Sequence, residues 1–499
     1  MGLAVKYTWR NGTRNLRGLP LPRGPRGLPI VGNLFQIPQV TPWLVYQDWA
    51  RKYGDVTYAE AMNQPIVIIN TLSAATRFLE KGSNCCDRLQ LPAFDMMKTD
   101  WNFPLMDYGQ DWRTHRRLFH KFLGPNSVSR YTPIVEEECL FLLRRLLAQP
   151  TEFPEMTLYY FGSILMRTSY GFEDFEYNKG LIRIAEAGLR GVSAAVVPGR
   201  MLVNNFPVLR YVPDWFPGTG WKRVCNEVAL ISHLALNKPF DEAKSRYNAG
   251  TANNKYPNMC TDVLDALGPE TDSKRAEEER IARNTVAQAY TAGSDTSVSL
   301  GIVLFGALAK YPKVQERAQA ELEAIIGTDR LPTGGDIANL PYIQALVKEL
   351  NRWYSVLPMS FPRRSRDDDE LDGYFIPGGT LILVNAWAIM HDPEVFEDPH
   401  EFRPERYLKD GKLDNSVLDP EAAAFGFGRR ICPGRYLSNT SFTLLAASLL
   451  AVFDFGPADG EDGKPKQVEV VMGSNMIANP RPFEIKIKPR SGMHAALIS

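Results

Sequence analysis

Apolar side chains recur at helical spacing along most of the chain, while short alternating runs are confined to a few places. The helical pattern predicts helices over residues 42–53, from 112 onward, and over 136–148, 224–243, 281–310, 341–354 and 436–453. In the first helix Trp43, Leu44, Tyr46 and Trp49 are predicted to face inward. Alternation predicts a hairpin of strands 56–61 and 66–70, with its turn around Asn63-Gln64-Pro65, and another strand over 381–384. The predicted fold class is therefore mainly α with small β-sheets.

The helix predicted over 281–310 is the longest, and it is apolar on most sides, which is typical of a central helix. It contains the run Ala292-Gly293-Ser294-Asp295-Thr296-Ser297. A glycine inside a helix costs about 1 kcal/mol relative to alanine, and an acid in apolar surroundings costs more. One interpretation is a local bulge at Gly293, with the Thr296 hydroxyl bonded back to a carbonyl. The other is a groove built to hold a ligand beside two polar side chains.

A second unusual stretch, residues 425–434, reads Phe-Gly-Phe-Gly-Arg-Arg-Ile-Cys-Pro-Gly. Gly426 and Gly428 permit a tight turn and close approach to a flat partner, and the adjacent arginines favour a thiolate at Cys432. The helix predicted over 436–453 follows at once, so backbone N–H groups at its start can point at the sulfur. A buried, inert cysteine is the alternative. Zinc is disfavoured because no second Cys or His lies at finger-type spacing.

Two apolar stretches are too irregular for simple helices. Residues 88–108 read as a buried loop that either lines a cavity or fills the core. Residues 196–203 and 206–217 suit a lid, a patch that dips into a bilayer, or a plain connection between helices. The sequence does not separate these interpretations.

Charge and cysteine usage narrow the function further. Fifty-seven basic residues balance fifty-seven acidic ones, which argues against a nucleic-acid partner. Six scattered cysteines form no disulfide framework and fit a reducing compartment. Lys6, Arg10, Arg14, Arg17, Arg23 and Arg26 precede the first acid, without an apolar stretch long enough to span a membrane. Such a segment resembles either the cytosolic flank of an anchor or a solvated tail.

Six motifs together resemble the cytochrome P450 family, most closely its fungal, microsomal-type members. The loop at 425–434 fills every fixed position of the family's Phe-x-x-Gly-x-Arg-x-Cys-x-Gly signature, and 292–297 matches its oxygen-binding signature. The others, in the family's order, are a proline-rich hinge, Trp112-x-x-x-Arg116, Glu349-x-x-Arg352 and Pro404-Glu405-Arg406. They span residues 20 to 434. The resemblance divides the chain into a basic segment (1–18) whose anchor is absent or removed, a hinge (19–40) and a catalytic domain (41–499).

The resemblance implies haem b between the long central helix and the cysteine loop, with Cys432 as the iron ligand. It also implies a role for each further site residue. Asp295 and Thr296 are expected to deliver protons to dioxygen, and the expected haem-binding set is Trp112, Arg116, Ala292, Gly293, Arg363, Phe425, Gly426, Arg430 and Gly434. Within that set Arg430, Arg363, Trp112 and Arg116 are expected on the propionates, while Glu349, Arg352 and Arg406 are expected to form a structural network.

The function implied is a monooxygenase that uses O2 to hydroxylate or epoxidise a hydrophobic small molecule. No glycine-rich flavin or nicotinamide fingerprint is present, so electrons are expected from an NADPH–cytochrome P450 reductase docking near Arg429 and Arg435, with cytochrome b5 as an additional candidate. The implied location is the cytosolic face of the endoplasmic reticulum membrane. The alternatives are a peroxide isomerase or dehydratase and a non-enzymatic haem binder, neither of which needs Asp295-Thr296. Expected to face the pocket are Phe94, Met96, Phe103, Tyr290, Leu357, Met359, Phe361 and Met476.

Overall fold

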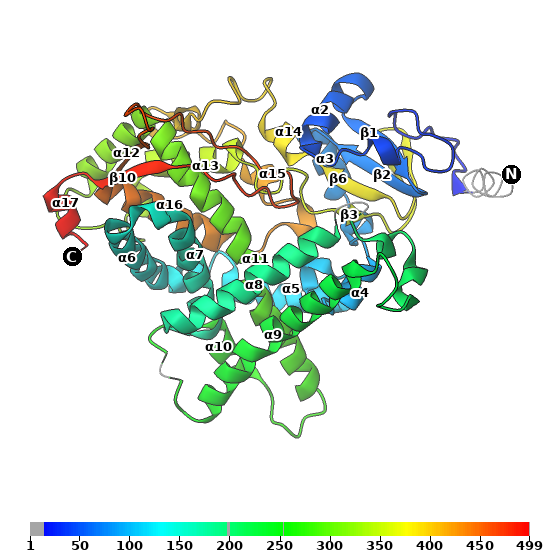
Figure 1. Cartoon of the computed structure of the whole chain (residues 1–499), viewed down its shortest axis with the longest axis horizontal. Helices are drawn as coiled ribbons and strands as arrows, with labels where there is room; N and C mark the ends of the chain where they lie inside the picture. The colour runs from blue at the N-terminus through cyan, green and yellow to red at the C-terminus, as the bar shows by residue number, and fades with distance from the viewer. Residues whose placement is uncertain (1–13, 197–199, 253, 499) are drawn as a thin grey trace.

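A computed structural model describes residues 14–196, 200–252 and 254–498 of the chain. Most of the molecule is a body of packed helices, and a small sheet lies at the end that carries the N-terminus (Figure 1). The helices are α2 (Pro42–Tyr53), α3 (Leu72–Leu79), α4 (Pro92–Met96), α5 (Gln110–Leu123), α6 (Thr132–Ala148), α7 (Phe153–Tyr170), α8 (Phe175–Ala195), α9 (Gly220–Asn248), α10 (Met259–Ala266), α11 (Arg275–Lys310), α12 (Pro312–Ile325), α13 (Pro341–Trp353), α14 (Ala386–Met390), α15 (Glu421–Ala424), α16 (Arg435–Val452) and α17 (Gly492–Ala496). The prediction of a mainly α fold with small sheets is confirmed.

Helix α11 is the axis of the helical body. It packs against α5, α7, α8, α9, α10 and α16, among other elements. Within the described residues it is the one helix long and apolar enough to cross a membrane, and its most apolar window is largely buried inside the protein. Burial among other helices explains why it is apolar on most sides.

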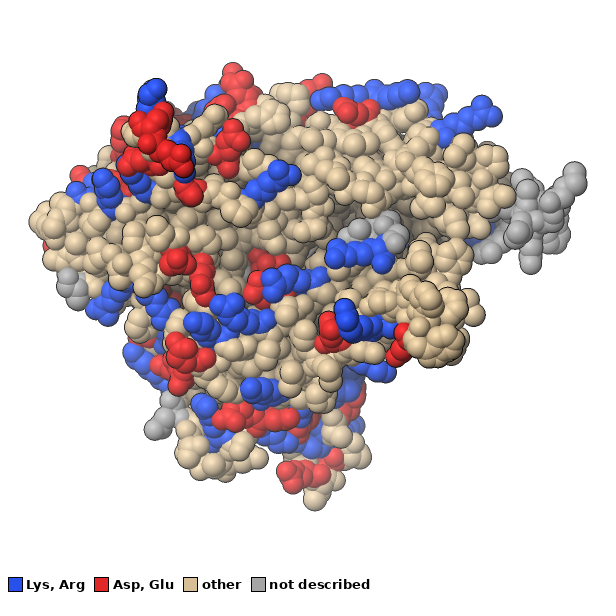
Figure 2. Space-filling view, in the orientation of Figure 1, with Lys and Arg blue, Asp and Glu red and all other residues tan. Residues whose placement is uncertain are grey.

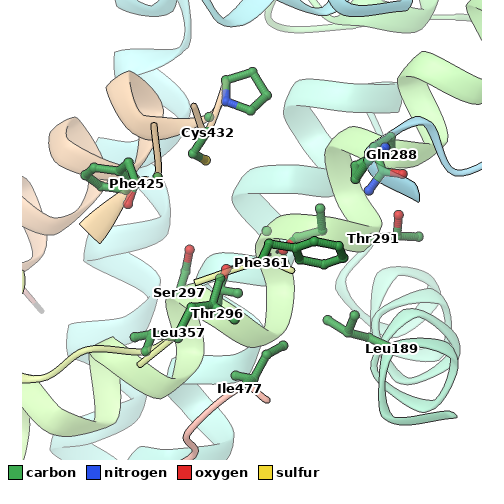
Figure 3. Close-up of a pocket in the computed structure, with 18 of the residues that line it drawn as sticks. Leu189, Gln288, Thr291, Thr296, Ser297, Leu357, Phe361, Phe425, Cys432 and Ile477 are labelled. Atoms are coloured by element: carbon green, nitrogen blue, oxygen red, sulfur yellow. Dashed lines mark hydrogen bonds between the residues drawn. The ribbon is translucent and has the colours of Figure 1, made fainter. Parts of the chain in front are cut away.

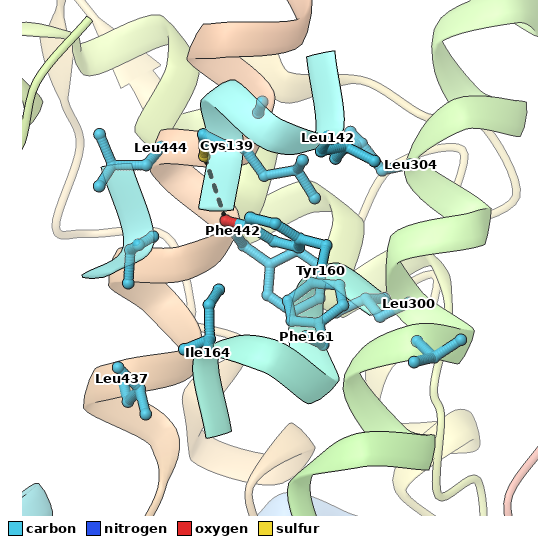
Figure 4. Close-up of a cluster of buried hydrophobic side chains, with 14 of the residues drawn as sticks. Cys139, Leu142, Tyr160, Phe161, Ile164, Leu300, Leu304, Leu437, Phe442 and Leu444 are labelled. Atoms are coloured by element: carbon cyan, nitrogen blue, oxygen red, sulfur yellow. Dashed lines mark hydrogen bonds between the residues drawn. The ribbon is translucent and has the colours of Figure 1, made fainter. Parts of the chain in front are cut away.

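The core beside α11 is built by α6, α7, α11 and α16, which bring Leu142, Phe161, Leu300 and Phe442 into one cluster (Figure 4). The Tyr160 hydroxyl is paired inside this cluster: it lies 3.3 Å from the Cys139 sulfur and donates to the Ser441 carbonyl at 3.0 Å. Because α16 begins two residues after Pro433, this cluster fixes the position of the cysteine loop.

The main sheet has the strand order β1-β2-β6-β3. β1 (Val56–Ala61) and β2 (Gln64–Ile69) are antiparallel, β2 runs parallel to β6 (Leu381–Val384), and β3 (Arg363–Arg364) pairs antiparallel with β6, with Arg363 opposite Ile382. The remaining strands form two-stranded pairs: β4 (Asp369–Leu371) with β5 (Tyr374–Ile376), β7 (Leu408–Lys409) with β8 (Lys412–Leu413), and β9 (Phe453–Pro457) with β10 (Ile485–Pro489). The edge position of β3 carries Arg363 to the functional site.

Several local predictions were wrong in detail. The hairpin turn lies at Met62-Asn63, both with positive φ, and Gln64 and Pro65 already belong to β2; two such residues match the twist of a tight hairpin. Leu44 is 40% exposed rather than inward. The stretch 88–108 contains the short helix α4, because Pro92 suits a first helical position. Helix α11 begins at Arg275, six residues before the predicted start. Glu277 and Glu278 lie in its first turn, where acidic side chains stabilise a helix.

The proline-rich segment is hydrogen-bonded to strands β1 and β5. The Tyr58 amide donates to the Arg23 carbonyl at 3.0 Å, and the Phe375 amide to the Pro20 carbonyl at 2.9 Å. A Cβ at Gly24 would lie 1.8 Å from the Tyr58 carbonyl oxygen, so only glycine fits there. Lys6 and Arg10 lie outside the described residues, while Arg14 pairs with Asp368. Proline stiffness and these backbone bonds together fix the chain here.

The network expected from two separate motifs, Glu349-x-x-Arg352 and Pro404-Glu405-Arg406, forms around Glu349 on α13. Arg352 donates to both Glu349 oxygens at 2.8 Å, and Arg406 Nε lies 3.0 Å from Glu349 Oε2. Arg352 also donates to the carbonyls of Met390, Pro399 and Glu401. This arrangement ties α13 to the segment 390–406 and leaves no role for these residues at the cavity.

Candidate functional site

A largely apolar cavity of about 380 Å³ lies between α11 and the cysteine loop (Figure 3). Its walls come from α8, α9 and α11, from residues 99–105 and 355–363, from β6, and from Met476 and Ile477 near the C-terminus. The cysteine loop and the start of α16 close the remaining side, with Phe425, Gly426, Cys432 and Gly434 on the lining. Elements distant in sequence thus meet around one chamber.

The cysteine loop holds its sulfur at the cavity wall. Gly426 and Gly428 have φ of +78° and +50°, and a Cβ at Gly428 would lie 2.9 Å from the Leu79 carbonyl oxygen. The Cys432 amide donates to the Phe425 carbonyl at 2.8 Å, which closes the loop. Burial raises the pKa of the Cys432 thiol, whereas N–H groups of Gly434 and Arg435 and the charge of Arg116 act to lower it. These groups would stabilise Cys432 as a negatively charged thiolate, the form that binds a metal.

Two buried arginines border the cavity with part of each guanidinium unused. Arg430 donates to the carbonyls of Cys86 at 2.8 Å and Met106 at 2.6 Å, and Arg363 donates to the Phe427 carbonyl at 2.5 Å. Among the described residues, Nη1 of each has no hydrogen-bond partner. Burial lowers the pKa of both side chains, that of Arg430 to about 10. A buried cation with a free donor is costly, so the site is suited to an anionic group.

A third cavity arginine, Arg88, was missed by the sequence reasoning. It is 5% exposed and donates to the carbonyls of Pro104, Phe361 and Pro362 at 2.8–3.1 Å. Burial lowers its pKa, and the charges of Arg430 and Arg363 lower it further. Its partners are distant in sequence, so no local signal identified it.

Trp112 and Arg116 lie behind the lining rather than on it. The Arg430 guanidinium stacks over the Trp112 ring, 4.4 Å from its centroid. This contact helps to hold the Arg430 side chain in place. Burial lowers the pKa of Arg116 to about 10, while nearby Cys432 raises it and Arg435 lowers it. Trp112 thus contacts Arg430, whereas Arg116 lies near Cys432 and Arg435; that both side chains reach the propionates stays a prediction.

Comparison with known proteins decides the family. The cytochrome P450 family model matches residues 22–487. Cytochrome P450 monooxygenase COX1 of Coprinopsis cinerea is 51% identical over 97% of this chain and 94% of its own length. Cytochrome P450 monooxygenase COX2 of the same fungus is 38% identical over 95% and 90%, and tryptamine 4-monooxygenase of Psilocybe cyanescens is 35% identical over 96% and 94%. The chain belongs to the cytochrome P450 family. It is a P450 monooxygenase, and the predicted resemblance to fungal members is confirmed.

Cytochromes P450 carry haem, and the residues of this P450 fit that group. The Cys432 sulfur offers a thiolate ligand, and the free Nη1 atoms of Arg363 and Arg430 offer donors for two carboxylates. Gly426 and Ala292 border the space between them, and a Cβ at Gly426 would meet no atom within 4 Å. A flat group that carries two carboxylates would therefore pair with both free guanidinium nitrogens, those of Arg363 and Arg430.

Arg430→Met should weaken haem retention. Losing a charge-assisted hydrogen bond costs about 1.5–3 kcal/mol, so we expect roughly ten- to a hundredfold faster haem transfer to an acceptor apoprotein. Arg77, whose side chain pairs with Asp372 at the surface, provides the control variant Arg77→Met. Equal transfer rates for wild type and Arg430→Met would contradict a role for Arg430 at the haem.

The motif at 292–297 lies on a continuous stretch of α11, without the bulge suggested for Gly293. A Cβ at Gly293 would lie 2.9 Å from Leu165 on α7, so close helix packing accounts for the glycine. The Thr296 hydroxyl donates to the Ala292 carbonyl at 3.3 Å and lines the cavity with Ser297. The bond from Thr296 was predicted; the reason for Gly293 was not.

Asp295 points away from the cavity, toward α8 and the C-terminal segment. Burial raises its pKa to about 6, the charge of Glu186 raises it as well, and Arg190 and a hydrogen bond with Asn479 lower it. Asn479 also accepts a hydrogen bond from Ser299, one turn further along α11. Asp295 is thus a carboxyl group poised to exchange a proton near neutral pH, one residue from a hydroxyl on the cavity wall.

Half of the predicted pocket residues line the cavity: Phe103, Leu357, Phe361 and Met476. The other four do not. Tyr290 faces α9, where its hydroxyl donates to the Ala235 carbonyl at 3.3 Å. Phe94 and Met96 pack with Val203 and Cys225, and Met359 packs beside Trp43. Lining residues that were missed include Leu189, Gln288, Thr291 and Val384.

Proposed function

We propose that this P450 binds haem b through Cys432 and hydroxylates or epoxidises a hydrophobic small molecule. The observation that carries the proposal is the position of the Cys432 sulfur on the wall of a mostly apolar cavity that Thr296 also lines. Bound haem supplies reductive activation of dioxygen and transfer of one oxygen atom to the substrate.

The chain's own residues would divide the remaining work. Cys432 would be the metal ligand, with Phe425, Gly426 and Gly434 shaping the loop around its sulfur. Arg363 and Arg430 would hold the propionates, supported by Trp112 and Arg116. Ala292 and Gly293 would keep α11 free of bulky side chains next to the cofactor. The apolar walls would orient the substrate and exclude water.

Asp295 and Thr296 would supply the protons. The Asp295 carboxyl can take a proton near pH 6, and Thr296 can hand one to the cavity from the adjacent position on α11. A positioned acid typically contributes about 10²–10⁴-fold to a rate. The presence of this acid–alcohol pair favours a monooxygenase over an isomerase, a dehydratase or a haem binder.

Asp295→Asn should lower product formation by about a hundredfold and flatten its pH profile near pH 6. It should also stabilise the fold. The pKa of Asp295 in the folded protein is about 6, above its ordinary value of 3.8. Between these two pH values the folded protein therefore binds more protons than the unfolded chain. Stability therefore falls as pH rises through that window, by on the order of 2 kcal/mol. Unfolding of wild type and Asp295→Asn at pH 5 and 7.5 measures the effect on stability. Product yield per NADPH measures the effect on catalysis. An unchanged yield in the Asp295→Asn variant would remove Asp295 from the proton path.

Electrons would come from an NADPH–cytochrome P450 reductase, with cytochrome b5 as a second candidate donor. The face behind the cysteine loop supports this proposal, because α5 and the loop expose Arg113, Arg117, Lys121 and Arg429 there. Arg435, in contrast, is partly buried against Tyr436 and Glu421. Exposed cations of this kind suit an acidic partner.

The endoplasmic reticulum membrane is the proposed location, with the catalytic domain on the cytosolic side. Exposed apolar side chains in the segment 202–216 support it: Leu202, Phe206, Val208, Tyr211, Trp215 and Phe216. Ile30 and Phe35 of the proline-rich segment are also exposed, and this end of the molecule shows few charges (Figure 2). None of the described residues of 196–217 lines the cavity, so this segment is proposed as a membrane patch.

The proposed function is tested by reconstitution with a fungal NADPH–P450 reductase and ¹⁸O2. We expect apolar substrates to gain one labelled oxygen atom in a reaction that requires NADPH. Conversion that needs peroxide alone, or that rearranges a peroxide without NADPH, would instead support the isomerase class.

A further inference from the structure

Gln288 is a polar side chain that is buried at the cavity wall and whose carboxamide oxygen is unpaired among the described residues. It lies on α11 one turn before Ala292, is 3% exposed and borders the cavity. Buried amide groups are almost always paired, so an unpaired one on a binding cavity indicates a partner that arrives with the ligand.

Three neighbouring polar side chains, Thr291, Asn284 and Ser232, are paired within the protein. The Thr291 hydroxyl donates to the Ala287 carbonyl at 2.9 Å, and the Asn284 amide lies 3.2 Å from the His115 ring. The Ser232 hydroxyl accepts from the Trp101 indole and donates to the Lys98 carbonyl, both at 2.8 Å. The Thr285 hydroxyl on the same helix is also unpaired, but Thr285 does not line the cavity. Among the described residues 284–291 of α11, Gln288 is therefore the unpaired polar side chain that borders the cavity.

A second amide supports the same assignment. Asn102 also lines the cavity, and its Oδ1 is buried without a partner. Asn102 immediately precedes the turn Phe103–Leu105, which packs against α11. Two carboxamides from different elements therefore offer hydrogen bonds to one chamber.

The charges on the cavity wall limit the ligand to a neutral molecule. The charged residues that line it are Arg88, Arg363 and Arg430, and the last two carry the donors suited to the propionates. No described carboxylate lines the cavity, so an ammonium group would lack a counter-ion. A substrate anion would have to compete with the cofactor for the same arginines.

The position of Gln288 sets an orientation. Figure 3 draws Gln288, Thr291 and Leu189 on one side of the cavity and Cys432 with Phe425 on the other. A group bound by Gln288 would therefore be held away from the sulfur, leaving the apolar remainder of the molecule near it.

We propose that Gln288 determines specificity by binding the single hydroxyl or carbonyl group of a neutral, otherwise hydrophobic substrate. A carboxamide both donates and accepts, so either oxygen group fits it. This inference rests on the proposed function, because it assigns the substrate class of the same cavity.

The test is spectral titration of the holoenzyme with biphenyl, 4-hydroxybiphenyl, 4-acetylbiphenyl and biphenyl-4-carboxylate. We expect one neutral oxygen compound to bind about tenfold more tightly than biphenyl, and the carboxylate to bind most weakly. The hydroxyl and acetyl compounds distinguish the two oxygen groups. In Gln288→Leu the advantage over biphenyl should vanish, while in the matched control Thr291→Val the ratio should persist.

A second measurement does not depend on the choice of probe. Because Leu fills similar space without an unpaired amide, Gln288→Leu should raise the unfolding temperature of the ligand-free holoenzyme by about 1–3 °C. A lower unfolding temperature, or a ratio unchanged in Gln288→Leu, would overturn the proposal. Loss of the haem-thiolate absorption in wild type would instead count against the proposed function, so the two failures are distinct.

Discussion

Cys432→Ser should abolish monooxygenase turnover, with a loss on the order of 10³-fold or more, the scale of removing an essential catalytic group. A serine oxygen is a harder and much weaker donor than a thiolate, so the electron density that favours oxygen activation would be lost. The backbone N–H groups of Gly434 and Arg435, which act on the sulfur, would then face a neutral hydroxyl. The measurement is NADPH-dependent product formation, with haem content determined on the same sample.

The matched control is Cys225→Ala. Cys225 is fully buried on α9 against Val192 and Val228, away from the cysteine loop. Its replacement should cost some stability through lost packing and leave turnover per haem unchanged. Activity retained in Cys432→Ser but lost in Cys225→Ala would reverse the assignment of the metal ligand.

Glu349→Gln should destabilise the fold by about 3–5 kcal/mol, because removing one partner leaves a buried charge uncompensated. Glu349 and Arg352 are both completely buried, and Arg406 is 5% exposed at the side chain. One carboxylate thus faces two guanidinium groups, and the Arg403 amide also donates to it at 2.8 Å. The neutral amide would leave both cations without an anion.

Denaturant unfolding of the holoprotein measures this effect. Asp48→Asn is the control, because Asp48 and Arg51 form an exposed pair of the same acid–arginine type three residues apart on α2. An exposed pair contributes little, so the control should unfold like wild type. A Glu349→Gln protein as stable as the control would show that the network is dispensable for the fold. Turnover per folded haem protein should change little, since the network does not border the cavity.

Local signals explain which features could be predicted from the sequence. The cysteine loop and the motif at 292–297 are each contained within ten residues or fewer, so their chemistry is legible without the fold. Helices with one apolar stripe, such as α2 and α13, were placed to within a residue. Mutual consistency among six motifs then identified the resemblance to the cytochrome P450 family.

Features set by distant contacts could not be predicted. Because α11 is apolar on most sides, its periodicity does not reveal which face meets the cavity; Tyr290 was assigned to the cavity and Gln288 was overlooked. Arg88 is held by the Phe361 and Pro362 carbonyls, 273 and 274 residues away. Gly293 is required by a side chain of α7 rather than by its own helix. Each of these depends on packing between elements that the sequence does not order in space.

The most direct test of the haem-thiolate assignment is the carbon monoxide difference spectrum of the reduced, purified protein. A strongly red-shifted Soret band that disappears in Cys432→Ala is the predicted result, since only a thiolate opposite carbon monoxide produces it. A band typical of a histidine ligand with Cys432 intact, or folded protein with no haem band, would contradict the account.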